Sequence, residues 1–425
     1  MGESLPLEMI VSRPILVRTR GTIRPMRSAP HVNRGVHTFA ACAFVLAGCG
    51  GGEGVSSQIS FDATTTTTTA SVTDSASVDG TTPGDELPVS SGPDDGVSGG
   101  VWQPASGNLE GLASECGNLS YVWSDPDRDM VIVGVALQGL WANEDGSDAW
   151  TQLGQAQGSD TITNRLSSIV RDPDHPDTFW ESGTYNGGGV YRTDDNGQTF
   201  QQLGDVMHSD LVAVDLSDPA RATLLTGVHE QSRLLRSDDG GQTWDDLSSS
   251  VPEGIGFTTA PHVIDAETFL LGTNNGPESG VFRTTDGGET WTRVVDSPIA
   301  GGPVVSEDGT ITWLLDRGGG TIRSDDDGQT WAIADSGGVI VPTATTLVQL
   351  PTGVMVTIGN SNLLASNDGG VTWETLGPAL PYQPNGVTYA PLRDTYYIWR
   401  FSCDFTADNP IAPDAVMRWD VGGDP

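Results

Sequence analysis

Lysine is absent from this sequence, and long apolar segments are absent as well. Its 20 basic residues are all arginine, and they face 56 aspartates and glutamates, for a formal net charge of −36. A protein that binds nucleic acid presents a basic surface to the phosphates, and attraction to anionic lipid headgroups needs the same. We therefore predict no nucleic-acid partner and no membrane contact through surface charge, and we interpret the acidity as favouring solubility.

One apolar stretch near the N-terminus is short. Residues 38–48 are uncharged and mostly apolar, and they follow Arg27 and Arg34. A helix that crosses a bilayer takes about 20 residues, whereas a basic start before a short apolar core is the layout of a secretory signal. The run ends in Leu46-Ala47-Gly48-Cys49, which resembles a bacterial lipobox. The resemblance implies cleavage before Cys49 and lipidation of its thiol; a plain secretory signal is the alternative.

We therefore expect a signal peptide over residues 1–48, with Met26 as an alternative start because the apolar run lies deep in the chain. Gly50 follows Cys49, where an aspartate would indicate retention in the inner membrane in Gram-negative sorting. We therefore expect the outer membrane, with the protein on the cell surface or facing the periplasm. Residues 49–100 consist largely of Gly, Ser, Thr, Asp and Pro, which bury too little apolar surface to fold. They are predicted to form a disordered tether with a reach of roughly 40 Å.

An octapeptide of the form Ser/Thr-x-Asp-x-Gly-x-Thr-Trp recurs along the rest of the chain. Its closing aromatic residues are 40 to 50 residues apart, and a degraded further copy ends at Trp150. The five good copies share an aspartate, a glycine and an aromatic residue: Asp195, Gly197, Phe200; Asp239, Gly241, Trp244; Asp286, Gly288, Trp291; Asp326, Gly328, Trp331; Asp368, Gly370, Trp373. Repeats of this period indicate a ring or array of similar units.

Each copy has the chemistry of a tight turn between two strands. Apolar residues precede it and a strand pattern follows it, which is typical of a hairpin. The aspartate can accept hydrogen bonds from turn N–H groups, and the glycine can take a positive φ. Two earlier strand patterns precede each copy, so that four short antiparallel strands repeat about every 45 residues. This arrangement describes a propeller blade.

The octapeptide is identified as the Asp box of BNR repeats. Over residues 101–425 the chain resembles the Asp-box propellers of sialidases, xyloglucanase-type glycoside hydrolases, the sortilin ectodomain and photosystem-assembly factors. The six boxes give six blades, and a seventh is split between residues 386–401 with 415–419 and residues 101–105. We predict an all-β chain with a single β-propeller of seven four-stranded blades, closed by pairing of the N- and C-terminal strands. A six-bladed ring is the alternative.

The four cysteines support this closure. Cys42 would leave with the signal and Cys49 would carry lipid, which leaves Cys116 and Cys403 in an oxidising compartment. Cys116 opens the first strand of blade 1 and Cys403 ends the second strand of blade 7, so both lie on one face of neighbouring blades. We expect a disulfide that fastens the seam; two free thiols are the other interpretation.

Candidate catalytic residues are few. Asp215, Asp265 and Glu307 lie on or near innermost strands, where two carboxylates could serve a glycosidase; solvated strand ends are the alternative interpretation. The sialidase pattern of an arginine triad with a Tyr–Glu pair is not found, and xyloglucanases of this type resemble two propellers rather than one. No cofactor is expected, except that Asp125, Asp127 and Asp129 alternate as in some calcium loops. They lack the glycine and distal glutamate of an EF-hand, and turn capping explains them more simply.

These patterns favour a non-catalytic cell-surface module that presents its axial face to a protein or glycan partner and is held at the membrane only by its lipid. A surface glycoside hydrolase is the first alternative, and an extracytoplasmic assembly factor is the second. Fold resemblance alone does not choose among them.

Overall fold

The computed structural model describes residues 100–422. The predicted signal peptide, Cys49 and nearly all of the predicted tether lie outside these residues. The described part contains 28 β-strands and two 3-10 helices, η1 (Gly107–Leu109) and η2 (Asp316–Gly318). Within it, we find no helix with the length and apolarity that a membrane crossing needs.

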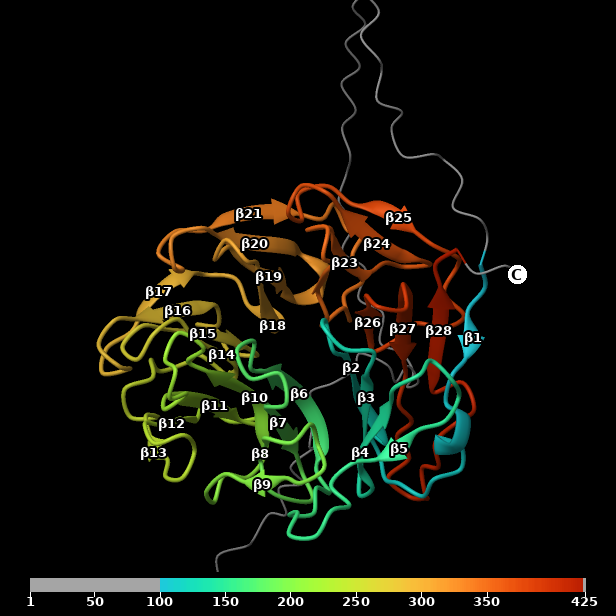
Figure 1. The fold of residues 1–425 in the computed structure, drawn as a ribbon. Helices are drawn as coiled ribbons and strands as arrows, with labels where there is room; N and C mark the ends of the chain where they lie inside the picture. Colours follow the sequence, from blue (N-terminus) through green and yellow to red (C-terminus); the bar gives the residue numbers. More distant parts are fainter. Residues whose placement is uncertain (1–99, 423–425) are drawn as a thin grey trace, which may run out of the picture. The chain divides into compact units, whose positions relative to one another are not determined.

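The strands form seven four-stranded antiparallel sheets arranged in a ring (Figure 1). Blade 1 contains β2 (Leu119–Ser124), β3 (Val131–Val135), β4 (Gly139–Asn143) and β5 (Thr151–Gln152). Blade 2 contains β6 (Arg165–Arg171), β7 (Phe179–Thr184), β8 (Val190–Thr193) and β9 (Gln201–Gln202). Blade 3 contains β10 (Ser209–Val214), β11 (Leu224–Val228), β12 (Leu234–Ser237) and β13 (Asp245–Asp246).

The remaining blades repeat the same order. Blade 4 contains β14 (Phe257–Val263), β15 (Phe269–Asn274), β16 (Val281–Thr284) and β17 (Thr292–Val295). Blade 5 contains β18 (Ile299–Val305), β19 (Ile311–Leu315), β20 (Gly320–Ser324) and β21 (Ala332–Asp335). Blade 6 contains β22 (Val348–Gln349), β23 (Met355–Ile358), β24 (Leu363–Ser366) and β25 (Glu374–Leu376).

Blade 7 closes the ring with strands from both ends of the described chain. It contains β26 (Gly386–Ala390), β27 (Thr395–Trp399), β28 (Val416–Asp420) and, at its outer edge, β1 (Gln103–Pro104). Gln103 pairs with Arg418 in the antiparallel register, and Figure 1 shows β1 beside β28. The predicted seven-bladed ring with terminal strand pairing is therefore confirmed.

A disulfide links Cys116 and Cys403 across the same seam, 287 residues apart in sequence, as predicted. It joins the segment before β2 to the segment after β27. Asn118 reinforces the junction, because its side chain donates to the Asn409 carbonyl at 3.0 Å and accepts from the Ser402 N–H at 2.9 Å.

The core lies between the blades. The second strand of every blade is buried along its whole length, as in β3, β7 and β15. A strand is buried along its whole length when both faces of its sheet are covered. Here the two neighbouring blades cover the two faces. Large, fully buried side chains such as Trp180, Trp313 and Trp399 lie in these second strands.

The up-and-down order of the strands gives the ring two different faces. We call the turn face the one formed by connections between first and second strands and between third and fourth strands. We call the loop face the one formed by connections between second and third strands and by the segments that join one blade to the next. The octapeptide turns lie on the turn face, and Cys116 and Cys403 lie on the loop face.

Candidate functional site

The five octapeptide turns on the turn face share one hydrogen-bond pattern. The Asp195 carboxylate accepts from the Thr199 N–H at 2.8 Å and from its hydroxyl at 2.6 Å. The Gly197 N–H donates to the Thr193 hydroxyl at 2.9 Å, and the glycine at this position takes a φ between 74° and 94° in all five copies. These contacts give the repeated residues a structural role in the turns.

The aspartates of these turns are held in the charged form. Hydrogen bonds from the flanking Ser and Thr side chains and from turn N–H groups lower the carboxyl pKa to about 2 at four positions: Asp239, Asp286, Asp326 and Asp368. A carboxylate held this way is a poor proton donor near neutral pH. The degraded copy has a different hydrogen-bond pattern. Its Asn143 Oδ1 accepts from the Gly146 N–H at 3.0 Å and from Arg393 Nη1 at 2.6 Å.

The three candidate catalytic carboxylates also lie on the turn face, in three separate blades. Asp215 is buried, and its Oδ1 accepts from Ser217 N–H at 2.9 Å and from Asp218 N–H at 3.1 Å. Asp265 caps the equivalent turn of blade 4, accepting from Thr268 N–H at 2.8 Å. Glu307 is exposed in the turn between β18 and β19. The structure thus shows turn capping at Asp215 and Asp265.

The candidate calcium residues occupy the equivalent turn of blade 1. Asp125 Oδ1 accepts from Asp127 N–H at 2.9 Å and lies 2.8 Å from Arg171 Nη1. Arg171 also pairs with Asp127 at 2.5 Å, and Arg393 pairs with Asp129. Arginine therefore supplies the positive charge that faces these three carboxylates. Among residues 100–422, no group of three or more His, Cys, Asp or Glu side chains is arranged to hold a metal ion.

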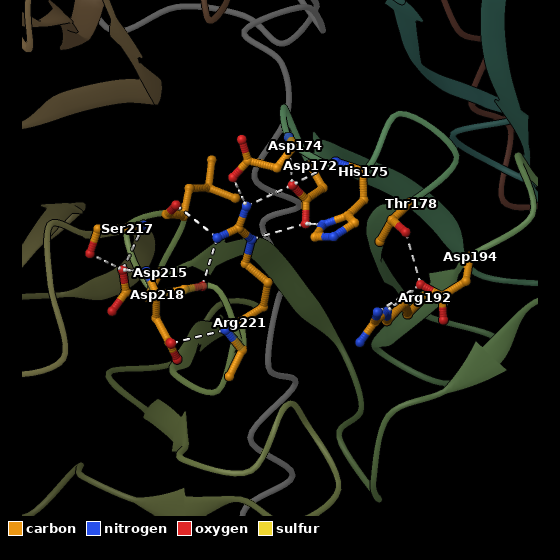
Figure 2. A network of polar contacts seen from close by, with 12 residues as sticks. Asp172, Asp174, His175, Thr178, Arg192, Asp194, Asp215, Ser217, Asp218 and Arg221 are labelled. Carbon is orange, nitrogen blue, oxygen red and sulfur yellow. Dashed lines mark hydrogen bonds and ion pairs between the residues drawn. The ribbon is translucent and has the colours of Figure 1, made fainter.

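A buried ion pair ties blade 2 to blade 3 on the turn face (Figure 2). Arg221 donates to Asp172 from Nε at 2.9 Å and from Nη2 at 2.7 Å, and both side chains are almost fully buried. Burial opposes ionisation, but hydrogen bonds from Arg221 and His175 hold the pKa of Asp172 well below its ordinary value. Arg221 also donates to the Leu216 and Asp218 carbonyls. The network is a structural bridge between adjacent turns.

The loop face carries a different kind of cluster, in which side chains from two blades converge on His229. His229 is the first residue after β11, Tyr185 is the first after β7, and Asp210 belongs to β10. His229 Nδ1 lies 2.5 Å from Asp210 Oδ1, and His229 Nε2 lies 3.0 Å from the Tyr185 hydroxyl. With its proton on Nδ1, the imidazole donates to the carboxylate and accepts from the phenol.

A second set of contacts extends this cluster toward blade 1. The Arg165 guanidinium lies over the Tyr185 ring, 4.4 Å from its centroid, and its Nε donates to Glu115 at 2.9 Å. Asn186 also donates to Glu115, which directly precedes the disulfide cysteine Cys116. The seam disulfide therefore anchors one end of the cluster. We call Glu115, Arg165, Tyr185, Asn186, His208, Asp210, His229 and Glu230 the His229 cluster.

The backbone of this cluster is strained. Tyr185, Asn186, His208 and Glu230 have φ values of 57°, 50°, 57° and 56°. Residues other than glycine, asparagine and aspartate reach this region at a cost of about 1 kcal/mol or more each, which applies here to Tyr185, His208 and Glu230. Local contacts hold the conformation: the Tyr185 N–H donates to His208 Nδ1 at 3.1 Å, and the His229 N–H donates to the His208 carbonyl at 2.6 Å. Strain that is maintained in this way concentrates at binding and catalytic sites.

Burial controls the ionisation of the cluster. It raises the pKa of Asp210, although the hydrogen bond with His229 opposes the rise. Burial and the charge of Glu230 raise the pKa of Tyr185. Glu181, in β7, is fully buried, and burial raises its pKa to about 8 although Asn164 donates to it at 3.0 Å. The cluster thus combines hydrogen-bond donors, acceptors and an aromatic ring at a partly buried surface.

The sequence patterns did not bring the members of the His229 cluster together. One pattern could have indicated it, because Tyr185 and His229 each stand two residues after a glycine of the second strand, Gly183 or Gly227. Equivalent positions in adjacent blades lie side by side in a ring, so aligning the blades places these two rings next to each other. Asp210 reaches His229 only because its side chain lies on one particular face of β10, and the repeat pattern does not specify which face that is.

A scan against models of known protein families gives no match, and a search of curated proteins gives none. Solved structures match in fold. The extracellular domain of a hybrid two-component system from B. thetaiotaomicron matches with a TM-score of 0.51 and 12% identity, over 75% of this chain and 42% of that one. A GH74 xyloglucanase from Xanthomonas campestris matches with a TM-score of 0.49 and 18% identity, over 70% of this chain and 52% of that one.

The structure of YCF48 bound to D1 peptide matches with a TM-score of 0.46 and 17% identity, over 76% of this chain and 97% of that one. The chain spans 45% and 52% of the two GH74 structures that it matches. The one match above with a TM-score over 0.5, at 12% identity, shows a similar fold and nothing about the ligand.

Proposed function

We propose that this protein is a non-catalytic surface lipoprotein that binds a protein or glycan partner through its loop face. The His229 cluster is the observation that carries the proposal. It brings polar, charged and aromatic side chains from blades 1 to 3 to one place and holds four residues at strained φ values. Such strain persists only where surrounding contacts maintain it, and binding sites are where it concentrates.

Other features support the remaining parts of the proposal. The motif Leu46-Ala47-Gly48-Cys49 and the basic residues before it support secretion and lipidation, and residues 50–100 would hold the propeller away from the membrane. The recurrence of one hydrogen-bond pattern in five turns supports their assignment as Asp boxes with a scaffolding role. The absence of lysine and the acidic side chains of the cluster favour a neutral or basic partner.

A panel experiment tests this function. The full chain is assayed for retention and turnover on neutral, acidic and basic polysaccharides, chromogenic glycosides and peptides. We expect retention without turnover, and we expect His229→Ala to weaken it at least tenfold because the substitution removes the residue that joins Asp210 to Tyr185. Leu392→Ala, in the exposed turn between β26 and β27, is the control on the turn face. Binding that Leu392→Ala weakens and His229→Ala leaves intact would contradict the proposal.

A glycoside hydrolase is the second candidate, and a specific arrangement favours it. Asp210 and Glu230 contact the same imidazole, at 2.5 Å from Nδ1 and 3.9 Å from Nε2 of His229. Asp210 is more buried than Glu230 and has a raised pKa, and two carboxyl groups in unequal environments are what glycosidases use. Turnover of any glycoside that Asp210→Asn abolishes would replace the first candidate with this one.

A further inference from the structure

A hollow of about 510 Å³ opens beside the His229 cluster, between blades 3 and 4. One wall is the β11–β12 loop with Glu230, Gln231 and Arg233, and the other is formed by Asp246, Ser248 and Phe257. The hollow is open rather than enclosed. Its volume lies within the range of about 300–1,000 Å³ that ligand pockets occupy.

The two walls are held together before any ligand arrives. Thr258 is fully buried; its N–H donates to the Gln231 carbonyl at 3.1 Å and its hydroxyl to the Arg233 carbonyl at 2.6 Å. Arg233 pairs with Asp246 at 2.8 Å, and the Ser248 N–H donates to Asp246 at 2.9 Å. Blade 4 therefore fixes the loop that blade 3 contributes. A site whose walls are fixed in advance loses less entropy on binding.

The lining has the chemistry that sugars require. An amide, a guanidinium–carboxylate pair and a serine offer adjacent donors and acceptors in planar or short side chains, which suits neighbouring hydroxyl groups. Phe257 is the half-buried aromatic residue of the lining, and the C–H face of a pyranose packs against aromatic rings of this kind. Glu230 and Asp246 outnumber the single Arg233, so the lining disfavours uronic acids and sulfated sugars.

We propose that this hollow is a binding subsite for a neutral oligosaccharide. The inference rests on the proposed binding function and names its ligand class. Because Glu230 directly follows His229, a sugar in the hollow lies next to the His229 cluster, and the open shape suits a segment of a longer chain rather than a closed small molecule. A peptide ligand is an outcome of the test and not part of the proposal.

The test is titration of the full chain with cellotriose, xylotriose, mannotriose and triacetylchitotriose, followed by calorimetry and by saturation-transfer NMR. At least one of the four is expected to bind. Phe257→Ala should lower that affinity tenfold or more because the stacking surface is lost. Thr258→Val, which keeps the side-chain shape and removes the hydroxyl, should lower it severalfold while circular dichroism stays unchanged. Leu392→Ala should leave it unchanged.

Three results would overturn the inference. One is that none of the four trisaccharides binds, and another is that Phe257→Ala and Gln231→Ala both bind as tightly as the wild type. The third is that trigalacturonate binds as tightly as the neutral trimers. If a panel ligand is still retained in a way that depends on His229, the binding function stands and only the sugar subsite fails. Loss of all retention on the panel overturns both.

Discussion

Glu181 is expected to make the stability of the propeller fall as the pH rises. The residue is fully buried in β7, and Asn164 Nδ2 donates to its Oε1 at 3.0 Å. Among the described residues, neither Glu181 Oε2 nor Asn164 Oδ1 has a hydrogen-bond partner. Protonation removes the charge that burial disfavours, and the hydrogen bond from Asn164 is the one contact that favours the charged form. The neutral acid therefore fits this site and the carboxylate does not.

The direction and the size of this pH dependence follow from the linkage between proton binding and folding. Burial raises the pKa of Glu181 from 4.5 to about 8 in the folded state, so between these values the folded chain holds a proton that the unfolded chain has released. The stabilisation is fully present below pH 4.5 and is lost as the pH rises to 8. At about 1.4 kcal/mol per pH unit, the loss amounts to about 3–5 kcal/mol.

The substitution Glu181→Gln tests this directly. Glutamine has the shape of the protonated acid, keeps an oxygen that can accept from Asn164 Nδ2, and stays neutral at every pH. We expect the variant to match the wild type within about 1 kcal/mol at pH 4.5 and to exceed it by about 3–5 kcal/mol at pH 8.5. Urea unfolding of the full chain at half-unit pH steps measures the difference, with Glu289→Gln as a control that makes the same charge change at an exposed position. A difference that stays constant from pH 4.5 to 8.5 would refute the reasoning.

Three further outcomes are expected. Arg221→Met should lower the free energy of unfolding by about 3–5 kcal/mol, since it leaves the Asp172 carboxylate buried without its partner; urea unfolding checks this, and a loss below about 1 kcal/mol would contradict it. Replacing Cys116 and Cys403 together by serine should lower the free energy of unfolding by about 5 kcal/mol, because the cross-link closes a very long loop. A wild type whose urea midpoint is the same with and without reductant would exclude this. His262→Gln should remove an acid-labile step, because burial lowers the pKa of His262 to about 4 and its stabilisation is lost as the pH falls from 6.5 to 4; equal unfolding curves of variant and wild type across that range would count against it.

The fold could be predicted because the repeat specifies it. Five good octapeptides and a degraded one fix the spacing of the blades, and the resemblance of residues 101–105 to the strand after an octapeptide predicted their pairing with β28. The disulfide followed from the same register, since it placed Cys116 and Cys403 on one face of neighbouring blades. Local pattern was sufficient here because each blade repeats the same short-range contacts.

The candidate site could not be predicted in the same way. Arg165 and Asp210 lie in strands, but the other six members come from segments between strands. The cluster also depends on positive φ values at Tyr185 and Glu230, which these residue types do not predict. The carboxylates that sequence analysis selected are near innermost strands, but Asp215 caps the turn that follows its strand. The aspartate that opens each of these turns could have indicated this capping role from the sequence. The position of Asp210 within β10, by contrast, is not matched by an aspartate at the same place in the other blades.

The most direct test of the account is a comparison of the two faces in one binding measurement. Wild type, His229→Ala and Leu392→Ala are titrated with whichever panel ligand the wild type retains, and folding is checked by circular dichroism. We predict that His229→Ala loses at least tenfold in affinity while Leu392→Ala stays within twofold of the wild type. A loss confined to Leu392→Ala, or no ligand retained by the wild type at all, would contradict a binding function on the loop face.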